Sequence, residues 1–406
     1  MSDTGGYSTP AFRRVEDVFR RQLDKAPGGG AACVYFRGEP VVDVWGGVKN
    51  EAGEPWQEDT LSVSFSTTKG VTSTLLHQLV EQGKLDYDDP VSKHWPEFGA
   101  NGKEAITIRD ILTHRAGLFG IRDLGLTAAD LTDWNKVTAA LAAAPPNQDY
   151  QPHSVYHALT FGWLIGELIN RASGEFISDR VRTALAEPLG LDGCFIGVPE
   201  NEHHRMAELL IGRDPDAPRP PDTPKKRRKR KVRRAMNKSW ATLGDWGLVP
   251  DFSAFLESVT IEDFQPRLLN RPEYLRAAIP AVNGVFTARS LARLYGALAC
   301  GGELDGARIL ESETVDAISE QQVFALDRSL YAPMRWRLGF HQPFVLRHRR
   351  PRRAFGHFGF GGSGAWADPA RELSVAITVN AGTGTPWGDM RILRVGAAAL
   401  RCAEKA

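Results

Sequence analysis

A serine and a lysine stand three residues apart in the tetrad Ser66-Thr67-Thr68-Lys69. On a helix this spacing puts both side chains on one face, within reach of each other. A serine hydroxyl becomes a good nucleophile when a neighbour removes its proton, and a lysine with a pKa lowered by burial can share that proton. A helix N-terminus would also stabilise a negative tetrahedral intermediate. Taken alone, however, the tetrad is more simply explained by a serine that caps a helix beside a surface lysine.

Two further segments carry side chains that can hold or move protons. Tyr156 lies at the start of the helical segment 159–170, and His357 lies on a C-terminal strand before the glycine-rich stretch 359–364. A tyrosine has a pKa near 10, so it needs a lowered pKa to act as a base at neutral pH, and an adjacent Lys69 cation could provide this. His357 would be a second donor that orients the tyrosine or an ester.

Several common kinds of catalytic site are excluded by the motifs that the chain lacks. No G-x-S-x-G elbow, H-E-x-x-H helix, P-loop or dinucleotide G-x-G-x-x-G pattern occurs. The cysteines are far apart and form no C-x-x-C pair, which argues against a zinc knuckle, a redox pair and a disulfide framework. They are Cys33, Cys194, Cys300 and Cys402. We therefore expect no metal site and no cofactor.

The elements that must position these residues are strands near both ends of the chain and helices between them. Segment 10–24 has apolar residues at helical spacing, and 31–36 with 40–45 alternates as a hairpin. Residues 65–82 predict a helix that begins at the S-x-x-K tetrad, and 107–110 predicts a capping box. Further helices are expected at 157–172, 178–187, 287–299 and 388–402, and strands at 354–360, 364–368 and 373–380.

This order predicts an α+β protein with two lobes. A sheet domain would combine 1–62 with 335–406, and a mostly helical lobe, 63–334, would be inserted between the two parts. A cleft between the lobes is then the expected site of chemistry. The stretch 213–238 is rich in proline and charge, and we interpret it as a solvated insertion.

Composition and charge limit the possible partners. The chain has 406 residues, 42% of them hydrophobic, and a formal net charge of +1, so it is an ordinary globular protein. Nine basic residues lie in 225–234, and the remainder is acidic, so the chain as a whole is not a nucleic-acid binder. The run could contact nucleic acid or another anionic partner, but a solvated loop is the simpler interpretation. No apolar stretch approaches the roughly 18 residues of a membrane span, and no secretion signal is apparent, so we expect a cytoplasmic protein.

The order of these motifs resembles the serine β-lactamase superfamily, and within it class C β-lactamases and family VIII carboxylesterases. S-x-x-K comes first, a tyrosine motif follows about 90 residues later, and a K-T-G-like triplet lies near the end. The resemblance covers nearly the whole chain and includes 45–47, 112–118, 188–191 and 301–306. It implies a β-lactamase/transpeptidase-like fold, with an antiparallel sheet flanked by the N- and C-terminal helices and an inserted helical lobe.

The resemblance also implies roles for individual residues. Ser66 would be the nucleophile, and Lys69 with Tyr156 the proton relay, in which Tyr156 is the general base. The backbone N–H groups of Ser66 and Phe360 would form the oxyanion hole, and His357 would replace the lysine of K-T-G. The implied oxyanion and substrate-binding residues are Ser66, His357, Gly359 and Phe360.

Two departures from the lactamase pattern favour an ester substrate. The asparagine of Y-x-N is Ala158, and K-T-G has become His-Phe-Gly, so polar recognition of a β-lactam is lost. We expect a hydrolase of small carboxylic esters with short acyl chains, acting through an acyl-enzyme on Ser66. The alternatives are a weak β-lactamase or D-Ala peptidase, an acyltransferase, and a non-catalytic interaction protein that uses the basic run. The sequence leaves the oligomeric state open.

Overall fold

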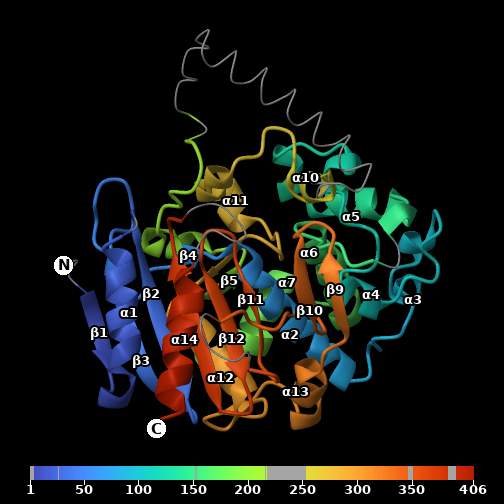
Figure 1. Cartoon of the computed structure of the whole chain (residues 1–406). Helices are drawn as coiled ribbons and strands as arrows, with labels where there is room; N and C mark the ends of the chain where they lie inside the picture. Colours follow the sequence, from blue (N-terminus) through green and yellow to red (C-terminus); the bar gives the residue numbers. More distant parts are fainter. Residues whose placement is uncertain are drawn as a thin grey trace.

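The computed structural model describes residues 4–25, 27–150, 153–214, 216, 253–345, 351–382 and 390–406. The basic run 225–234, and with it most of the expected insertion 213–238, lies outside the described residues. The α+β class and the β-lactamase-like arrangement of a sheet with an inserted helical lobe are confirmed (Figure 1). The boundaries expected at 62 and 335 stay predictions.

The main sheet has six antiparallel strands in the order β1-β3-β2-β13-β12-β11. Its central pair joins the two ends of the chain, because β2 and β13 are neighbours, with Phe36 opposite Leu373 and Gly30 opposite Val379. The sheet is therefore complete only when both termini are folded. The strands are β1 (Thr4–Ser8), β2 (Gly29–Phe36), β3 (Glu39–Gly47), β11 (Phe355–Phe358), β12 (Gly364–Asp368) and β13 (Leu373–Val379).

Helices cover both faces of this sheet. The terminal helices α1 (Arg13–Leu23) and α14 (Arg391–Ala403) lie together on one face (Figure 1), and α12 (Ala288–Ala299) packs on the other. Strand β2 shows why both faces need to be covered, because its alternate side chains are apolar on each face. Ala32, Val34 and Phe36 join the core under α1 and α14, whereas Ala31, Cys33 and Tyr35 join the core shared with the helical lobe.

The helical lobe is built around α2 (Thr68–Glu81), whose residues from Thr68 to Leu79 are all buried. A helix that is buried on every side belongs in the middle of a core. It packs on α6 (Thr160–Ser173), and the expected capping box of Thr107 and Asp110 begins α4. The other α-helices are α3 (Val91–His94), α4 (Ile108–Leu112), α5 (Trp134–Ala143), α7 (Ile177–Val181), α8 (Glu187–Leu189), α10 (Ser253–Val259), α11 (Pro272–Arg276) and α13 (Ser312–Ser319).

Short elements complete the lobe. A three-stranded sheet has the strand order β4 (Ser62–Val63), β6 (Gly284–Phe286), β5 (Cys194–Ile196). A hairpin joins β9 (Val323–Asp327) to β10 (Ala332–Trp336). A second hairpin pairs β7 (Glu303–Leu304) with β8 (Ala307–Arg308). A π-helical turn, Arg182–Ala186, follows α7. The 3₁₀ turns are η1 (Pro10–Phe12), η2 (Phe65–Thr67), η3 (Pro96–Gly99), η4 (Ile121–Leu124), η5 (Ala129–Thr132), η6 (Gln148–Tyr150), η8 (Glu200–Arg205) and η9 (Pro266–Asn270).

Many of the shorter elements are absent from the sequence prediction, and β1 and β9 illustrate why. Strand β1 is short, rich in glycine and at the sheet edge, so its sequence carries no hydrophobic alternation. In β9 the usual burial of apolar residues and exposure of charged ones is reversed, because Phe324 and Leu326 are exposed while Asp327 is buried.

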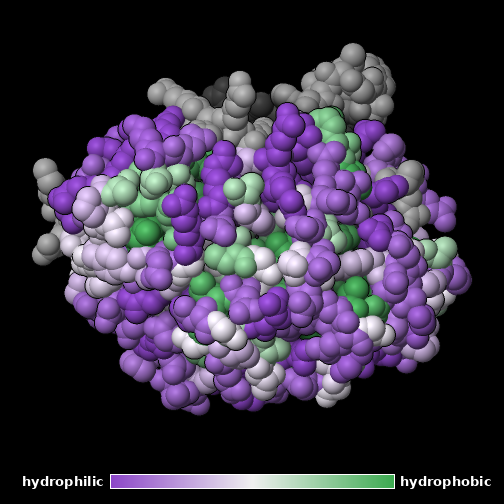
Figure 2. Space-filling view, turned by 90° about the horizontal axis from the view of Figure 1, so that it is seen from below, coloured by the Kyte–Doolittle hydropathy of each residue, from purple (hydrophilic) through white to green (hydrophobic). Residues whose placement is uncertain are grey.

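The surface contains little contiguous hydrophobic area on the face seen from below (Figure 2), where hydrophobic residues form small separate patches among hydrophilic ones. In the described part of the chain, no helix is long and apolar enough to cross a membrane.

The contact between α2 and α12 gives a test of core packing. A Cβ at Gly70 would lie 2.0 Å from the hydroxyl oxygen of Tyr295. That buried hydroxyl has no hydrogen-bond partner among the described residues. We expect Gly70→Ala to lower the free energy of unfolding by about 1–3 kcal/mol through overpacking, although alanine favours a helix.

The matched variant is Tyr295→Phe, which removes the clashing atom. Alone it should change stability by less than about 1 kcal/mol, because the lost hydroxyl makes no hydrogen bond. Combined with Gly70→Ala it should recover most of the loss, as measured by urea unfolding of the four proteins. Additive effects in the double variant would contradict this packing.

Candidate active site

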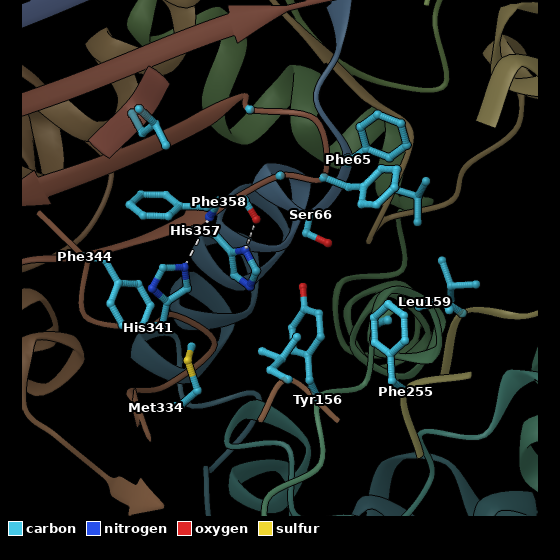
Figure 3. Close-up of a pocket in the computed structure, with 18 of the residues that line it drawn as sticks. Phe65, Ser66, Tyr156, Leu159, Phe255, Met334, His341, Phe344, His357 and Phe358 are labelled. Carbon is cyan, nitrogen blue, oxygen red and sulfur yellow. Dashed lines mark hydrogen bonds between the residues drawn. The ribbon is translucent and has the colours of Figure 1, made fainter. Parts of the chain in front are cut away.

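Ser66 lies on a strained turn at the start of α2. The preceding residue, Phe65, has φ of +46°, an uncommon conformation for a residue other than glycine. Two hydrogen bonds hold this turn: the Thr68 hydroxyl donates to the Phe65 carbonyl at 2.5 Å and accepts from the Gly284 N–H at 2.9 Å. The turn presents Ser66 to a cavity between the sheet and the helical lobe (Figure 3).

Lys69 is fully buried and its amine has three oxygen neighbours. Nζ lies 3.0 Å from Oγ of Ser66, 2.6 Å from the carbonyl oxygen of Ala158 and 3.2 Å from that of Ala281. No carboxylate pairs with this amine among the described residues, and burial lowers the pKa of Lys69 well below its usual value. Carbonyl oxygens only accept hydrogen bonds, so a neutral amine would donate both N–H groups to them. Its lone pair would then face the Ser66 hydroxyl.

Tyr156 lies in the segment before α6 with its hydroxyl pointing toward Ser66 (Figure 3). Its ring stacks on Trp336 with a centroid distance of 5.7 Å and on His357 at 5.9 Å, and Nζ of Lys69 lies 4.9 Å from the ring centroid. Three sequence-predicted residues, Ser66, Lys69 and Tyr156, are thus brought together.

The pKa of Tyr156 moves in the direction opposite to the one expected from the sequence. Burial raises this pKa above 10, and a hydrogen bond with Ser66 lowers it by less. The expectation that Lys69 lowers the pKa of Tyr156 is wrong, because burial of the phenol is the largest effect on this pKa and raises it. The phenol therefore keeps its proton at neutral pH.

His357 is a neutral imidazole with one free nitrogen. Its Nδ1 lies 3.2 Å from the carbonyl oxygen of Phe358, which can only accept, so Nδ1 carries the proton. Nε2 is buried and has no partner among the described residues. Burial, followed by the neighbouring His341 and Lys69, lowers the pKa of His357 well below 6.5. His357 therefore offers an acceptor at Nε2 and not the donor expected from the sequence.

Three further buried histidines surround Tyr156 and His357. His341 accepts the N–H of Phe358 at Nε2 (3.2 Å) and has Nδ1 3.0 Å from a carbonyl. His114 lies edge-on to the Tyr156 ring at 4.8 Å, and the N–H of His157 donates to its Nδ1. Burial lowers the pKa of both His341 and His157 to about 4. Within the described residues, no group of three or more His, Cys, Asp or Glu side chains is arranged to hold a metal.

Asp327 holds the backbone of Tyr156 by a hydrogen bond, and the sequence analysis did not identify this residue. Its Oδ1 accepts the N–H of Tyr156 at 3.3 Å and those of Ser329 and Leu330 at 3.0 and 2.9 Å. Burial raises the pKa of Asp327 to about 6. An acid at the end of an apparently apolar strand was the available signal, but nothing local links it to a tyrosine 171 positions away.

The expected oxyanion-hole residues also meet at Ser66. A Cβ at Gly359 would lie 2.2 Å from the carbonyl oxygen of Ser64, so only glycine lets this segment approach the nucleophile turn. Among the hydrogen bonds between described residues, none uses the N–H of Ser66 or of Phe360 as a donor. Both groups are therefore available to a ligand.

The cavity beside these groups has a volume of about 840 Å³ and a largely apolar lining. Ser66, Tyr156 and His357 lie at its centre, Met334 and Phe344 on one side, and Leu159 and Phe255 on the other (Figure 3). No Lys, Arg, Asp or Glu is among its described lining residues. An uncharged apolar molecule suits such a site.

Comparisons with known proteins agree with this geometry. The family model described as Beta-lactamase matches residues 15–399. The protein "Esterase/beta-lactamase LipL" of Mycobacterium tuberculosis (strain ATCC 25618 / H37Rv) is 39% identical over 379 residues, which cover 92% of this chain and 82% of LipL.

Two solved structures are similar to this chain over 98% of its residues and over the full length of their own chains. One is a family VIII carboxylesterase, with 30% identity and a TM-score of 0.82. The other is a penicillin-binding protein homologue from Caulobacter crescentus, with 33% identity and a TM-score of 0.81. The similarity thus extends along nearly the whole sequence and fold, and the chain belongs to the β-lactamase family of serine hydrolases.

Proposed function

We propose that this protein hydrolyses uncharged carboxylic esters through an acyl-enzyme on Ser66. The observation that carries the proposal is the 3.0 Å contact between Ser66 Oγ and a buried Lys69 amine at the edge of an apolar cavity. The names of LipL and of the family VIII carboxylesterase, both of which include esterase activity, support the same reaction class.

In the acylation step, Oγ of Ser66 attacks the ester carbonyl and its proton passes to the neutral amine of Lys69. The carbonyls of Ala158 and Ala281 favour this transfer, because they hold the two N–H groups and leave the lone pair toward Ser66. The N–H groups of Ser66 and Phe360 stabilise the negative oxygen of the tetrahedral intermediate. This assigns the base to Lys69 in place of Tyr156.

Tyr156 then acts as the proton donor to the leaving alcohol. A phenol whose pKa is raised by burial is protonated at neutral pH and can give its proton to an alkoxide, which is far more basic. Lys69 returns its proton to the Tyr156 oxygen, so the acyl-enzyme again contains a neutral amine and a phenol.

The surroundings of the site favour esters over β-lactams. The family's lysine is replaced by His357, a neutral residue whose free nitrogen is an acceptor and would repel a carboxylate. Ala158 has no side-chain amide to bind the antibiotic. Because the name of LipL includes β-lactamase as well, nitrocefin is the appropriate comparison substrate.

The first prediction concerns the nucleophile. Ser66→Ala should abolish hydrolysis of p-nitrophenyl butyrate and labelling by a fluorophosphonate probe, because it removes the hydroxyl whose oxygen lies 3.0 Å from Nζ of Lys69. The matched control is Ser312→Ala, on the exposed start of α13. Equal rates for wild type and Ser66→Ala would refute the proposal.

A second prediction uses the leaving group to distinguish two roles for Tyr156. These are proton donor to the leaving alcohol and base for the attack by Ser66. In Tyr156→Phe, kcat/KM for butyl butyrate should fall about 100-fold, because butoxide needs a proton to leave. For p-nitrophenyl butyrate the fall should be under about 10-fold, because p-nitrophenolate leaves without one. Equal losses on the two substrates would instead identify Tyr156 as the base for attack.

A third prediction treats Asp327 as a positioning residue for Tyr156. Asp327→Ala leaves the buried N–H of Tyr156 unpaired and should lower kcat about 10-fold with little change in KM, while costing about 1–3 kcal/mol of stability. Asp327→Asn keeps an oxygen acceptor and should restore most of kcat. An alanine variant with reduced stability and an unchanged kcat would assign Asp327 a structural role alone.

A further inference from the structure

The free nitrogen of His357 needs a ligand that the acylation step does not supply. His357 lines the cavity, and its Nε2 is buried and has no partner among the described residues. An unsatisfied buried acceptor is rare in proteins and costs free energy. Its partner is therefore expected to enter with the reaction.

The other oxygen and imidazole acceptors on side chains of the described cavity lining are already engaged. Both nitrogens of His341 have partners in the protein backbone, and the Tyr156 hydroxyl is hydrogen-bonded to Ser66. The indole N–H of Trp336 has no partner among the described residues, but it is a donor and not an acceptor. Nε2 of His357 is thus the free side-chain acceptor beside the reacting atoms (Figure 3).

Hydrolysis of the acyl-enzyme requires such an acceptor. A water molecule in an apolar cavity must be held by hydrogen bonds if it is to attack in a defined direction. We propose that Nε2 of His357 accepts a hydrogen bond from the water molecule that attacks the acyl-enzyme, and so orients it for deacylation. This inference rests on the proposed function.

The step balances without a charge on His357. The oxygen of the water bonds to the acyl carbon, and the bond from that carbon to Ser66 Oγ breaks. One proton of the water passes to the Tyr156 oxygen, whose own proton moves to Lys69, and Lys69 protonates Ser66. The other O–H of the water stays bonded and donates to Nε2 throughout. An imidazole that remains neutral suits this role.

The experiment measures acylation and deacylation separately with p-nitrophenyl butyrate. The pre-steady-state burst reports acylation, and intact mass reports the fraction of acylated Ser66 at steady state. His357→Leu should keep a full burst, slow deacylation about 10- to 100-fold and accumulate the acyl-enzyme. His357→Gln, whose side-chain oxygen can accept, should recover part of the deacylation rate. The full burst also shows that the variant is folded.

A matched variant and an added alcohol complete the test. His341→Leu removes a neutral imidazole from the same wall, and it should not slow deacylation selectively. With 1-butanol present, His357→Leu should slow hydrolysis but not butyl ester formation, because an alcohol has one O–H, whose proton passes to Tyr156. The ratio of butyl ester to butyrate should therefore rise.

Two results would overturn this inference. One is unchanged deacylation in His357→Leu, and the other is an equal slowing of acylation and deacylation. If wild type shows no burst that depends on Ser66, the proposed function itself fails.

Discussion

The amine of Lys69 is held by the carbonyl oxygens of Ala158 and Ala281, and this contact connects three separate parts of the chain. Residue 158 precedes α6, residue 281 precedes β6, and the lysine lies on α2. The same junction is tightly packed, since a Cβ at Gly162 would lie 2.5 Å from the backbone nitrogen of residue 281. A buried amine without an acidic partner is costly when charged, so burial lowers the pKa of Lys69.

Burial sets the chemistry of the remaining groups as well. It lowers the pKa values of Lys69 and of the histidines around Tyr156, and it raises that of Tyr156. Tyr156 and the histidines around it are therefore neutral near pH 7, and the charged form of Lys69 is disfavoured. Proton transfer among neutral groups requires little charge separation in a medium of low polarity. This explains how an apolar cavity and an acyl-transfer site coexist.

The sequence predicted the elements whose signals are local. The spacing of Ser66 and Lys69, the Thr107 capping box and the alternation in β2 and β3 depend on neighbours within a few residues, and the structure shows them where expected. Strand β1 and the hairpin β9–β10 depend on distant packing partners and were missed.

Quantities that depend on burial were the least predictable. The direction of the Tyr156 pKa shift and the tautomer of His357 follow from which groups surround them in the folded chain. A sequence motif identifies the side chains but not the groups that are packed around them in the folded chain. Asp327 illustrates the same limit, because its importance comes from a hydrogen bond to a residue 171 positions away.

The outer edge of β11 accounts for the place of the proposed oxyanion site. N–H groups along a strand point alternately to its two edges, so those of Gly356 and Phe358 share one edge, and Phe360 follows two residues after the strand ends. The N–H of Gly356 donates to the His341 carbonyl at 3.1 Å, and that of Phe358 donates to the His341 ring at 3.2 Å.

The N–H of Phe360 has no acceptor among the described residues. An exposed strand edge is usually a liability, because it can pair with another chain. Here His341 and the nucleophile turn cover the edge of β11 up to Gly359, whose missing side chain allows the close approach. The pairing therefore ends at Gly359 and leaves the N–H of Phe360 without an acceptor among the described residues, as the proposed oxyanion role requires.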